Sequence, residues 1–440
     1  MKKRILVITP TYPPYQGSHT ERMTALVNSL KENGFVVGVL TTEVLKGNTS
    51  YNPKLDTNFD PDVFVYRAPF GFLHRRSYER TSSYTSIKYG NSNDPNLNID
   101  GLSVKRKVVR FIEQIKKRVL IPDSLIDWYF SAIKYVKQDN IISEFSPDII
   151  MSCSMPNTCH LIGYKLAKKY HLDLAMDIAD PWVYISYYQH GKIAFLLEKS
   201  IESKILKYSR LISFSTKGCQ DLYIEKYNLP KHKVVTVVTG YNEDLLTLAQ
   251  SVNNITSEEK TDSINMIYGG ALQVGGRDPV PFIQAVASQE NNIQFFLRTD
   301  NVSFAKALLP KMCNNIQISE YAPFDVFFQE MLSSDVLVFF GNATADQLPG
   351  KIFNYIPTGK LIFYISSVED ESKDQAISIV KDYGKYVISS NNVQSIIEGL
   401  KKIIEIKKQG LLDKQPENQN IVKYSSKNQF GVLSDLIKHL

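Results

Sequence analysis

One stretch of the sequence combines residues that can bind a negatively charged group with a local pattern that would position them. It runs from Asp346 to Lys360 and reads DQLPGKIFNYIPTGK. Pro349 suits the first turn of a helix, because it lacks only an N–H that would be unpaired there. A helix N-terminus that carries Gly350 and Lys351 would offer free N–H groups, a positive dipole end and an ammonium group to a phosphate. The alternative is an ordinary strand–helix turn with one solvated lysine.

Two apolar runs enclose this stretch and predict the elements that would hold it. Residues 335–340 and 361–365 both read as buried parallel strands. Three apolar residues give the short helix between them a core face: Ile352, Phe353 and Ile356. The stretch would therefore lie at the carboxyl end of a strand, where open α/β sheets bind their ligands.

A glycine-rich loop precedes that site in the same half of the chain. It spans residues 269–279 and reads GGALQVGGRDP, between an apolar run at 264–268 and a helix that continues through Ala287. The backbone can approach a pyrophosphate at Gly270 and Gly276, and Arg277 supplies positive charge at the helix start. Glycine-rich loops alone are weak indicators of such a site.

Two aspartates follow an apolar run in the first half of the chain. The predicted strand at 172–176 ends in Asp177-Ile-Ala-Asp180-Pro-Trp182. Either carboxylate at a strand's carboxyl end could orient a hydroxyl or accept its proton. Asp180 could instead cap the next helix. Trp182 would line the same cleft.

The N-terminus opens a doubly wound sheet. A strand at 4–9, a helix at about 19–32 and a strand at 35–40 follow one another, without the dinucleotide pattern Gly-x-Gly-x-x-Gly. Gly17 and Ser18 precede the helix, where small residues let a ligand approach the backbone. Gly17 could instead serve only the turn.

The strand–helix alternation restarts after a polar zone at 247–262, so the 440 residues predict two domains. We expect a first domain at 1–240 with an insertion at about 43–120, a second at 241–425, and a terminal segment at 426–440 that packs toward the first domain. The insertion contains one expected strand at 63–66 and would carry acceptor specificity or act as a lid. The remaining predicted helices are one that ends at about residue 136 and those at 157–169, 193–208, 217–227, 323–332, 377–383, 393–406 and 431–440, and the remaining strands are 146–151, 211–215, 234–238 and 293–297.

Composition excludes several classes of protein. With 43% hydrophobic and 22% charged residues the chain is globular, and its net charge of +6 does not argue for nucleic-acid binding. No apolar run approaches a bilayer-spanning length, and the run after the basic N-terminus is too short for a signal peptide, so we expect a cytoplasmic protein. The four cysteines lack the spacing of a zinc site, so we expect core thiols and no metal.

Residues 104–119 form a predicted basic amphipathic helix. Such a helix can dock on anionic headgroups at the inner face of the membrane. The alternative is a solvated helix whose apolar stripe packs on its own domain.

These features together resemble retaining glycosyltransferases of the GT-B fold, in particular the bacterial capsule and exopolysaccharide enzymes of the family-four type. A subgroup reads Pro-x-Lys-x-x-x-Tyr-x-x-x-Gly-Lys, and five residues fit it: Pro349, Lys351, Tyr355, Gly359 and Lys360. The family's two carboxylates, seven residues apart, correspond to Asp346 and Asn354, so the second is an amide here.

The resemblance extends along nearly the whole chain. Residues 122–182 are similar to the family's "PD…W" and "D.rDpW" segments, although Ala179 replaces the usual arginine. The family's "fPP…GG…R" fits four residues, with Ser18 in place of the second glycine: Pro13, Pro14, Gly17 and Arg22. The loop at 269–279 is similar to the family's "Y.G.l….Rdp".

The resemblance implies two doubly wound Rossmann-like domains facing across a cleft, with the last helix crossing back to the first domain. It implies a nucleoside diphosphate sugar donor, UDP slightly favoured over GDP, on the second domain and a saccharide acceptor, often lipid-linked, on the first. No cofactor or metal is implied, and the anomeric configuration would be retained. The implied donor-binding residues are Gly270, Gly276, Arg277, Gly350, Lys351, Asn354 and Tyr355, the catalytic ones are Asp177, Asp180 and Asp346, and those of the acceptor or cleft are Gly17, Ser18 and Trp182.

Two other functions remain open, and a third is discounted because of where its motif lies. A metal-dependent transferase needs Asp-x-Asp at the end of a strand, but Asp60-Pro-Asp62 precedes one. A nucleotide-sugar epimerase can share the two-domain fold. A non-catalytic sugar-binding or partner protein is favoured by Asn354 in place of a carboxylate.

Overall fold

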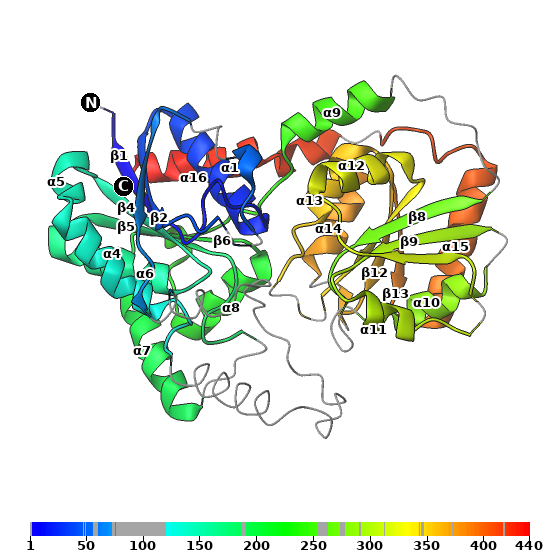
Figure 1. Ribbon diagram of the computed structural model, residues 1–440, viewed down its shortest axis with the longest axis horizontal. Coiled ribbons are helices and arrows are strands. Elements are labelled where there is room, and N and C mark those ends of the chain that lie inside the picture. The colour runs from blue at the N-terminus through cyan, green and yellow to red at the C-terminus, as the bar shows by residue number, and fades with distance from the viewer. Residues whose placement is uncertain are drawn as a thin grey trace. The chain divides into compact units, whose positions relative to one another are not determined.

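The chain divides into two compact units in a computed structural model (Figure 1). Unit 1 comprises Met1–Ser215, Cys219–Val237 and Phe430–Leu440, and unit 2 comprises Thr216–Gly218 and Val238–Gln429. The structure describes all residues except 1, 47, 49, 56–59, 73–74, 76–119, 186–190, 254–262, 273–277, 290–291, 312, 343, 345–346, 369, 372–373 and 417–418.

Unit 1 is built on a seven-stranded sheet in which every pairing is parallel, in the order β3-β2-β1-β4-β5-β6-β7. Its strands are β1 (Arg4–Ile8), β2 (Val36–Thr42), β3 (Val63–Ala68), β4 (Ile149–Cys153), β5 (Asp173–Ile178), β6 (Leu211–Phe214) and β7 (Val234–Thr236). The helices are α1 (Ser18–Glu32), α4 (Ile126–Gln138), α5 (Ile141–Phe145), α6 (Thr158–Tyr170), α7 (Lys192–Tyr208), α8 (Lys217–Tyr227) and α16 (Ser426–Lys438).

Helices cover both faces of this sheet, which is why its central strands are continuous apolar runs. One face packs against α4, α6, α7 and α8. The other packs against α1 and α16, the latter through Phe430, Leu433 and Ile437. The end of the chain therefore contributes to the core of unit 1, as expected for the last helix of this fold.

Unit 2 is built on a second, six-stranded parallel sheet in the order β10-β9-β8-β11-β12-β13. The strands are β8 (Ile264–Gly269), β9 (Ile293–Arg298), β10 (Ile316–Ser319), β11 (Val336–Phe340), β12 (Leu361–Ser366) and β13 (Tyr386–Ser390). The helices are α9 (Glu243–Asn253), α10 (Val280–Ala287), α11 (Val302–Ala307), α12 (Phe324–Ser333), α13 (Ile352–Tyr355), α14 (Gln375–Tyr383) and α15 (Val393–Lys408). Apolar clusters on the two faces of the sheet form its core.

The predicted α/β class with two Rossmann-like sheets is confirmed, but several elements differ from expectation. The segment at 63–68, placed within an insertion, is the edge strand β3 and pairs in parallel with β2. The edge strands β10 and β13 were not predicted, because each is short and partly exposed and so carries a weak apolar signal. The polar zone at 247–262 overlaps α9, and α16 begins five residues before the expected helix.

The sequence predicts a membrane-docking helix at 104–119 and no segment long and apolar enough to span a bilayer. The basic segment at 104–119 lies outside the described residues. Among the helices that are described, none combines the length and the apolar character needed to cross a bilayer.

Candidate functional site

The centre of the unit 2 sheet contains a topological switch point. Strands β8 and β11 are neighbours, but the chain leaves β8 toward β9 on one side and leaves β11 toward β12 on the other. The connections after the two strands therefore diverge at the carboxyl ends of the sheet, which is where open α/β sheets bind ligands. Gly270 follows β8 directly, and Lys351 lies in the connection after β11.

The structure brings Gly270 and Lys351 into contact at this point. The Lys351 Nζ lies 4.9 Å from the centroid of the Tyr268 ring, and a Cβ added to Gly270 would lie only 1.7 Å from that Nζ. The buried Tyr268 donates its hydroxyl to the Ala271 carbonyl oxygen over 3.2 Å, which fixes the ring. The missing side chain of Gly270 thus makes room for an ammonium group at the switch point.

The helix after Lys351 is shorter than the sequence suggested. Helix α13 has four residues and continues as a 3-10 turn that ends at Gly359, whose φ of 70° is left-handed. A single turn has little macrodipole, so the predicted dipole contribution to anion binding is small. In the described part of this site the positive charge comes from the Lys351 ammonium group.

Tyr355, one of the predicted donor-binding residues, has its side chain in the core of unit 2. Its side chain is fully buried, and its hydroxyl donates to the Val338 carbonyl oxygen over 3.1 Å. The tyrosine therefore anchors α13 on β11. Of the other predicted donor residues, Asn354 is half-buried and Gly350 is exposed, whereas Gly276, Arg277 and Asp346 lie outside the described residues.

In unit 1, Asp177 lies inside β5 rather than after it. Its carboxylate is fully buried and accepts two hydrogen bonds from the Arg22 guanidinium, at 2.9 and 2.6 Å, and a third from the Ser213 hydroxyl at 2.7 Å. Burial alone would raise the pKa of Asp177, but the charge and hydrogen bonds of Arg22 outweigh it and hold the pKa below the usual value. Asp177 is therefore a buried, paired anion in this structure, and of the two aspartates Asp180 is the one that is partly exposed.

The Arg22–Asp177 pair joins three elements of unit 1. Arg22 comes from α1 and Asp177 from β5, 155 residues apart in sequence. The Arg22 guanidinium also lies 5.1 Å from the ring centroid of Phe430, which belongs to α16. Arg22, the arginine of the N-terminal motif, thus holds α1 against β5 and α16.

Asp180 occupies a different environment two residues beyond β5. It is half-buried in an irregular turn. The alternative that Asp180 caps the next helix does not hold, because α7 begins at Lys192 and has Gly191 at its N-cap. Asp180 remains a candidate for contact with an acceptor hydroxyl.

Trp182 points into unit 1 instead of lining a cleft. The indole is 4% exposed, and its Nε1 donates to a Glu198 carboxylate oxygen over 2.6 Å. The Trp182 backbone N–H donates to the Tyr223 hydroxyl over 2.9 Å, and that hydroxyl donates to Glu202. Burial raises the pKa of Glu202 to about 7. Trp182 therefore anchors the turn that carries Asp180.

His19 is a polar residue of this region that sequence reasoning missed. It lies at the start of α1, and its Nε2 is 3.0 Å from the Thr9 hydroxyl oxygen at the end of β1. The Thr9 hydroxyl also lies 3.1 Å from the Thr11 carbonyl oxygen; when it donates there, His19 Nε2 is the donor to Thr9. Burial lowers the His19 pKa to about 4, so the imidazole is neutral at physiological pH. The sequence feature that could have identified His19 is its position directly after Gly17 and Ser18.

Gly17 and Ser18 lie at the same end of α1. Both are exposed, and Gly17 has a φ of 136°, which side-chain-bearing residues rarely adopt. A Cβ at Gly17 would meet nothing within 4 Å. Backbone conformation thus accounts for this glycine.

Within the part of the chain that the structure describes, no three His, Cys, Asp or Glu side chains lie close enough together to hold a metal ion. Cys153, Cys159 and Cys219 are buried, and Cys313 is partly buried.

No protein-family model and no curated protein matches this sequence. Several solved structures are similar over the whole chain. A glycosyltransferase from Rickettsia africae shares 13% identity at a TM-score of 0.61, with 100% of both chains covered. Sucrose-phosphate synthase from Thermosynechococcus elongatus shares 10% identity at 0.62, with 100% of this chain and 99% of that one covered. UDP-GlcNAc 2-epimerase from Neisseria meningitidis, bound to UDP-GlcNAc, shares 13% identity at 0.52, with 99% and 100% covered. Together with the two sheets, these similarities show the GT-B fold.

Proposed function

We propose that this protein is a glycosyltransferase that moves a sugar from a nucleoside diphosphate sugar to a saccharide acceptor. The observation that carries the proposal is the Lys351 ammonium beside Gly270 at the switch point of unit 2. A diphosphate has the charge that such a lysine attracts, and open α/β sheets bind nucleotides at switch points. The fold shared with a glycosyltransferase supports the reaction class.

In the proposed reaction, the leaving nucleoside diphosphate gains negative charge as the sugar–oxygen bond breaks. Lys351 stabilises that charge, assisted by Arg277 from the glycine-rich loop, so no metal is needed. Asp346 contacts the transferred sugar, and Asn354 hydrogen-bonds the ribose without the strength of a charged acceptor. The anomeric configuration is retained, as in the enzymes that the sequence resembles.

The acceptor half of the proposal rests on the turn after β5. Asp180 orients the acceptor hydroxyl, while the buried Asp177 and Trp182 hold the surrounding backbone. We propose a lipid-linked saccharide as acceptor and UDP as the favoured nucleotide. The basic segment at 104–119 would bring the protein to the inner face of the membrane.

Titration calorimetry with UDP and GDP tests the donor half of the proposal. We expect one of the two to bind and to raise the melting temperature, because a ligand that binds only the folded state stabilises it. Failure of both to bind would reject the donor site and favour a non-catalytic protein.

An epimerase is the second candidate, because a UDP-GlcNAc 2-epimerase bound to UDP-GlcNAc has the same fold. Incubation with UDP-GlcNAc in the absence of acceptor separates the two functions. An epimerase interconverts the nucleotide sugars, whereas a transferase leaves the sugar unchanged or releases it by slow hydrolysis.

A further inference from the structure

Helix α7 presents an apolar stripe to the exterior of unit 1. Ile193, Leu196 and Leu197 are 78%, 65% and 54% exposed. Their spacing of three and four residues places them on one face of the helix. Isolated exposed apolar residues are normal, but a contiguous stripe indicates an interaction surface.

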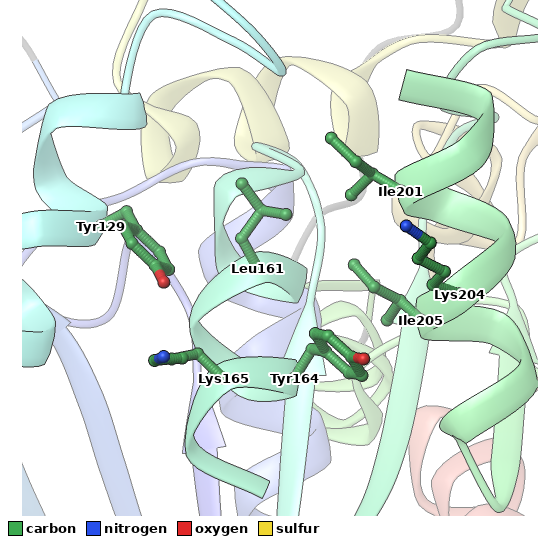
Figure 2. Close-up of a pocket in the computed structure, with 7 residues that line it drawn as sticks. All are labelled: Tyr129, Leu161, Tyr164, Lys165, Ile201, Lys204 and Ile205. Atoms are coloured by element: carbon green, nitrogen blue, oxygen red, sulfur yellow. The ribbon is translucent and has the colours of Figure 1, made fainter. Parts of the chain in front are cut away.

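The stripe continues into a groove between α4, α6 and α7. Ile201 and Ile205 of α7 line this groove together with Leu161 of α6, and its volume is about 270 Å³. Lys165 and Lys204 lie on opposite sides of the three apolar residues (Figure 2). The groove thus has an apolar floor and a cationic rim.

The charges on these helices are segregated by sign. The two acids of α7, Glu198 and Glu202, are buried, where they accept hydrogen bonds from Trp182, Tyr223 and Tyr227. Helix α6 contains no acidic residue. The exposed charged side chains of the two helices are all lysines: Lys165, Lys168, Lys169, Lys192, Lys204 and Lys207.

We propose that this face, called here the α6–α7 surface, docks on an anionic lipid bilayer. It consists of the stripe at Ile193, Leu196 and Leu197 and the lysines of α6 and α7. Apolar side chains would enter the boundary between headgroups and acyl chains while the lysines meet lipid phosphates. A symmetric contact with a second copy of the chain would instead set lysines against lysines, which is unfavourable.

The proposal for this surface uses no residue of the segment at 104–119 and does not depend on the proposed transferase activity. Its test therefore needs no substrate. Full-length protein is sedimented with phosphatidylcholine vesicles that contain or lack phosphatidylglycerol. The test variants are Leu196→Gln/Leu197→Gln and Lys165→Gln/Lys204→Gln, and glutamine retains helix propensity.

Matched controls change equivalent residues elsewhere. Val432→Gln/Leu436→Gln alters exposed apolar residues four positions apart on α16, and Lys401→Gln/Lys402→Gln removes exposed charges from α15. We expect the wild type to bind the anionic vesicles selectively. Removing two surface lysines should lower partitioning by roughly thirtyfold, and the leucine variant should lower it by a similar factor, whereas the controls should stay within about twofold.

Three results would overturn the proposal. The wild type could fail to sediment with anionic vesicles, or both test variants could bind as tightly as the wild type. The wild type could also form a dimer in solution that Leu196→Gln/Leu197→Gln dissociates, without binding lipid. If the leucine variant does not fold, the lysine variant decides, since its two side chains are exposed.

Discussion

Replacing Gly270 with alanine would place a methyl group where Lys351 lies. The added Cβ would be 1.7 Å from the Lys351 Nζ and 2.6 Å from the Tyr268 hydroxyl oxygen. The backbone of Gly270 is not left-handed, so alanine itself is not strained there. The flexible lysine must move away, which forfeits its contact with the Tyr268 ring at a cost of about 0.5–1 kcal/mol. The buried, hydrogen-bonded Tyr268 ring must shift as well, so we expect a clear fall in melting temperature in addition to the displacement of the lysine.

The effect on ligand binding should be much larger. If the ammonium group of Lys351 holds the diphosphate, displacing it removes a charged hydrogen bond worth about 1.5–3 kcal/mol. That loss corresponds to roughly a ten- to hundredfold increase in Kd. Lys351→Met should weaken binding by the same factor, because it removes the charge and keeps much of the side-chain volume.

Titration calorimetry of UDP and GDP into four proteins measures this coupling: wild type, Gly270→Ala, Lys351→Met and the double variant. If alanine acts only by displacing the lysine, the double variant should bind no more weakly than Lys351→Met. Gly431→Ala on α16 is the matched control, because a Cβ there meets nothing within 4 Å, and it should bind as the wild type does.

Two results would refute this reasoning. Wild-type affinity in Lys351→Met would mean that the lysine does not contact the diphosphate. Additive losses from the two substitutions would mean that Gly270→Ala acts by a route other than Lys351.

Three further predictions concern unit 1. Arg22→Met should destabilise the fold by about 3–5 kcal/mol in urea unfolding, because it leaves the Asp177 carboxylate buried without its cation; Arg22→Met/Asp177→Asn should recover part of that loss. Burial raises the pKa of Glu202 to about 7 in the folded state, whereas its pKa in the unfolded chain is about 4.5. Between these two pH values the folded state holds a proton that the unfolded state has released, so the free energy of unfolding should fall as the pH rises from about 4.5 to 7. Glu202→Gln should remove this component, and identical pH profiles of the two unfolding free energies would contradict it. Asp180→Asn should lower transfer to acceptor while UDP affinity and melting temperature stay unchanged, and equal losses in binding and turnover would reject its assignment to the acceptor.

Local sequence patterns were sufficient for the class of fold. Runs such as Val336–Phe340 and residues 361–365 are apolar at successive positions because both faces of each strand are covered, and helical spacing identified the segments between them. The edge strands β10 and β13 were missed because a partly exposed strand needs fewer apolar residues. Long-range packing, not a local pattern, determines that they are strands.

For the site residues, too, local patterns identified some positions in the sequence but did not show which way every side chain points. The sequence identified Gly270 and Lys351 from the kinds of loop that contain them. It also identified Trp182 and Tyr355 as site residues, yet both side chains face the interior. A motif defines residue types and spacing, whereas the direction of a side chain depends on the neighbours that pack around it.

Two successions of strands and helices, with glycine and lysine at loops that follow strands, can be read from the sequence alone. Which strands are neighbours is known only from the folded chain. The pairing of β8 with β11 puts Gly270 beside Lys351, and the sheet order of unit 1 joins Arg22 to Asp177 across 155 residues. Periodicity along a chain reports which face of an element is buried, but it carries no information about which distant element buries that face.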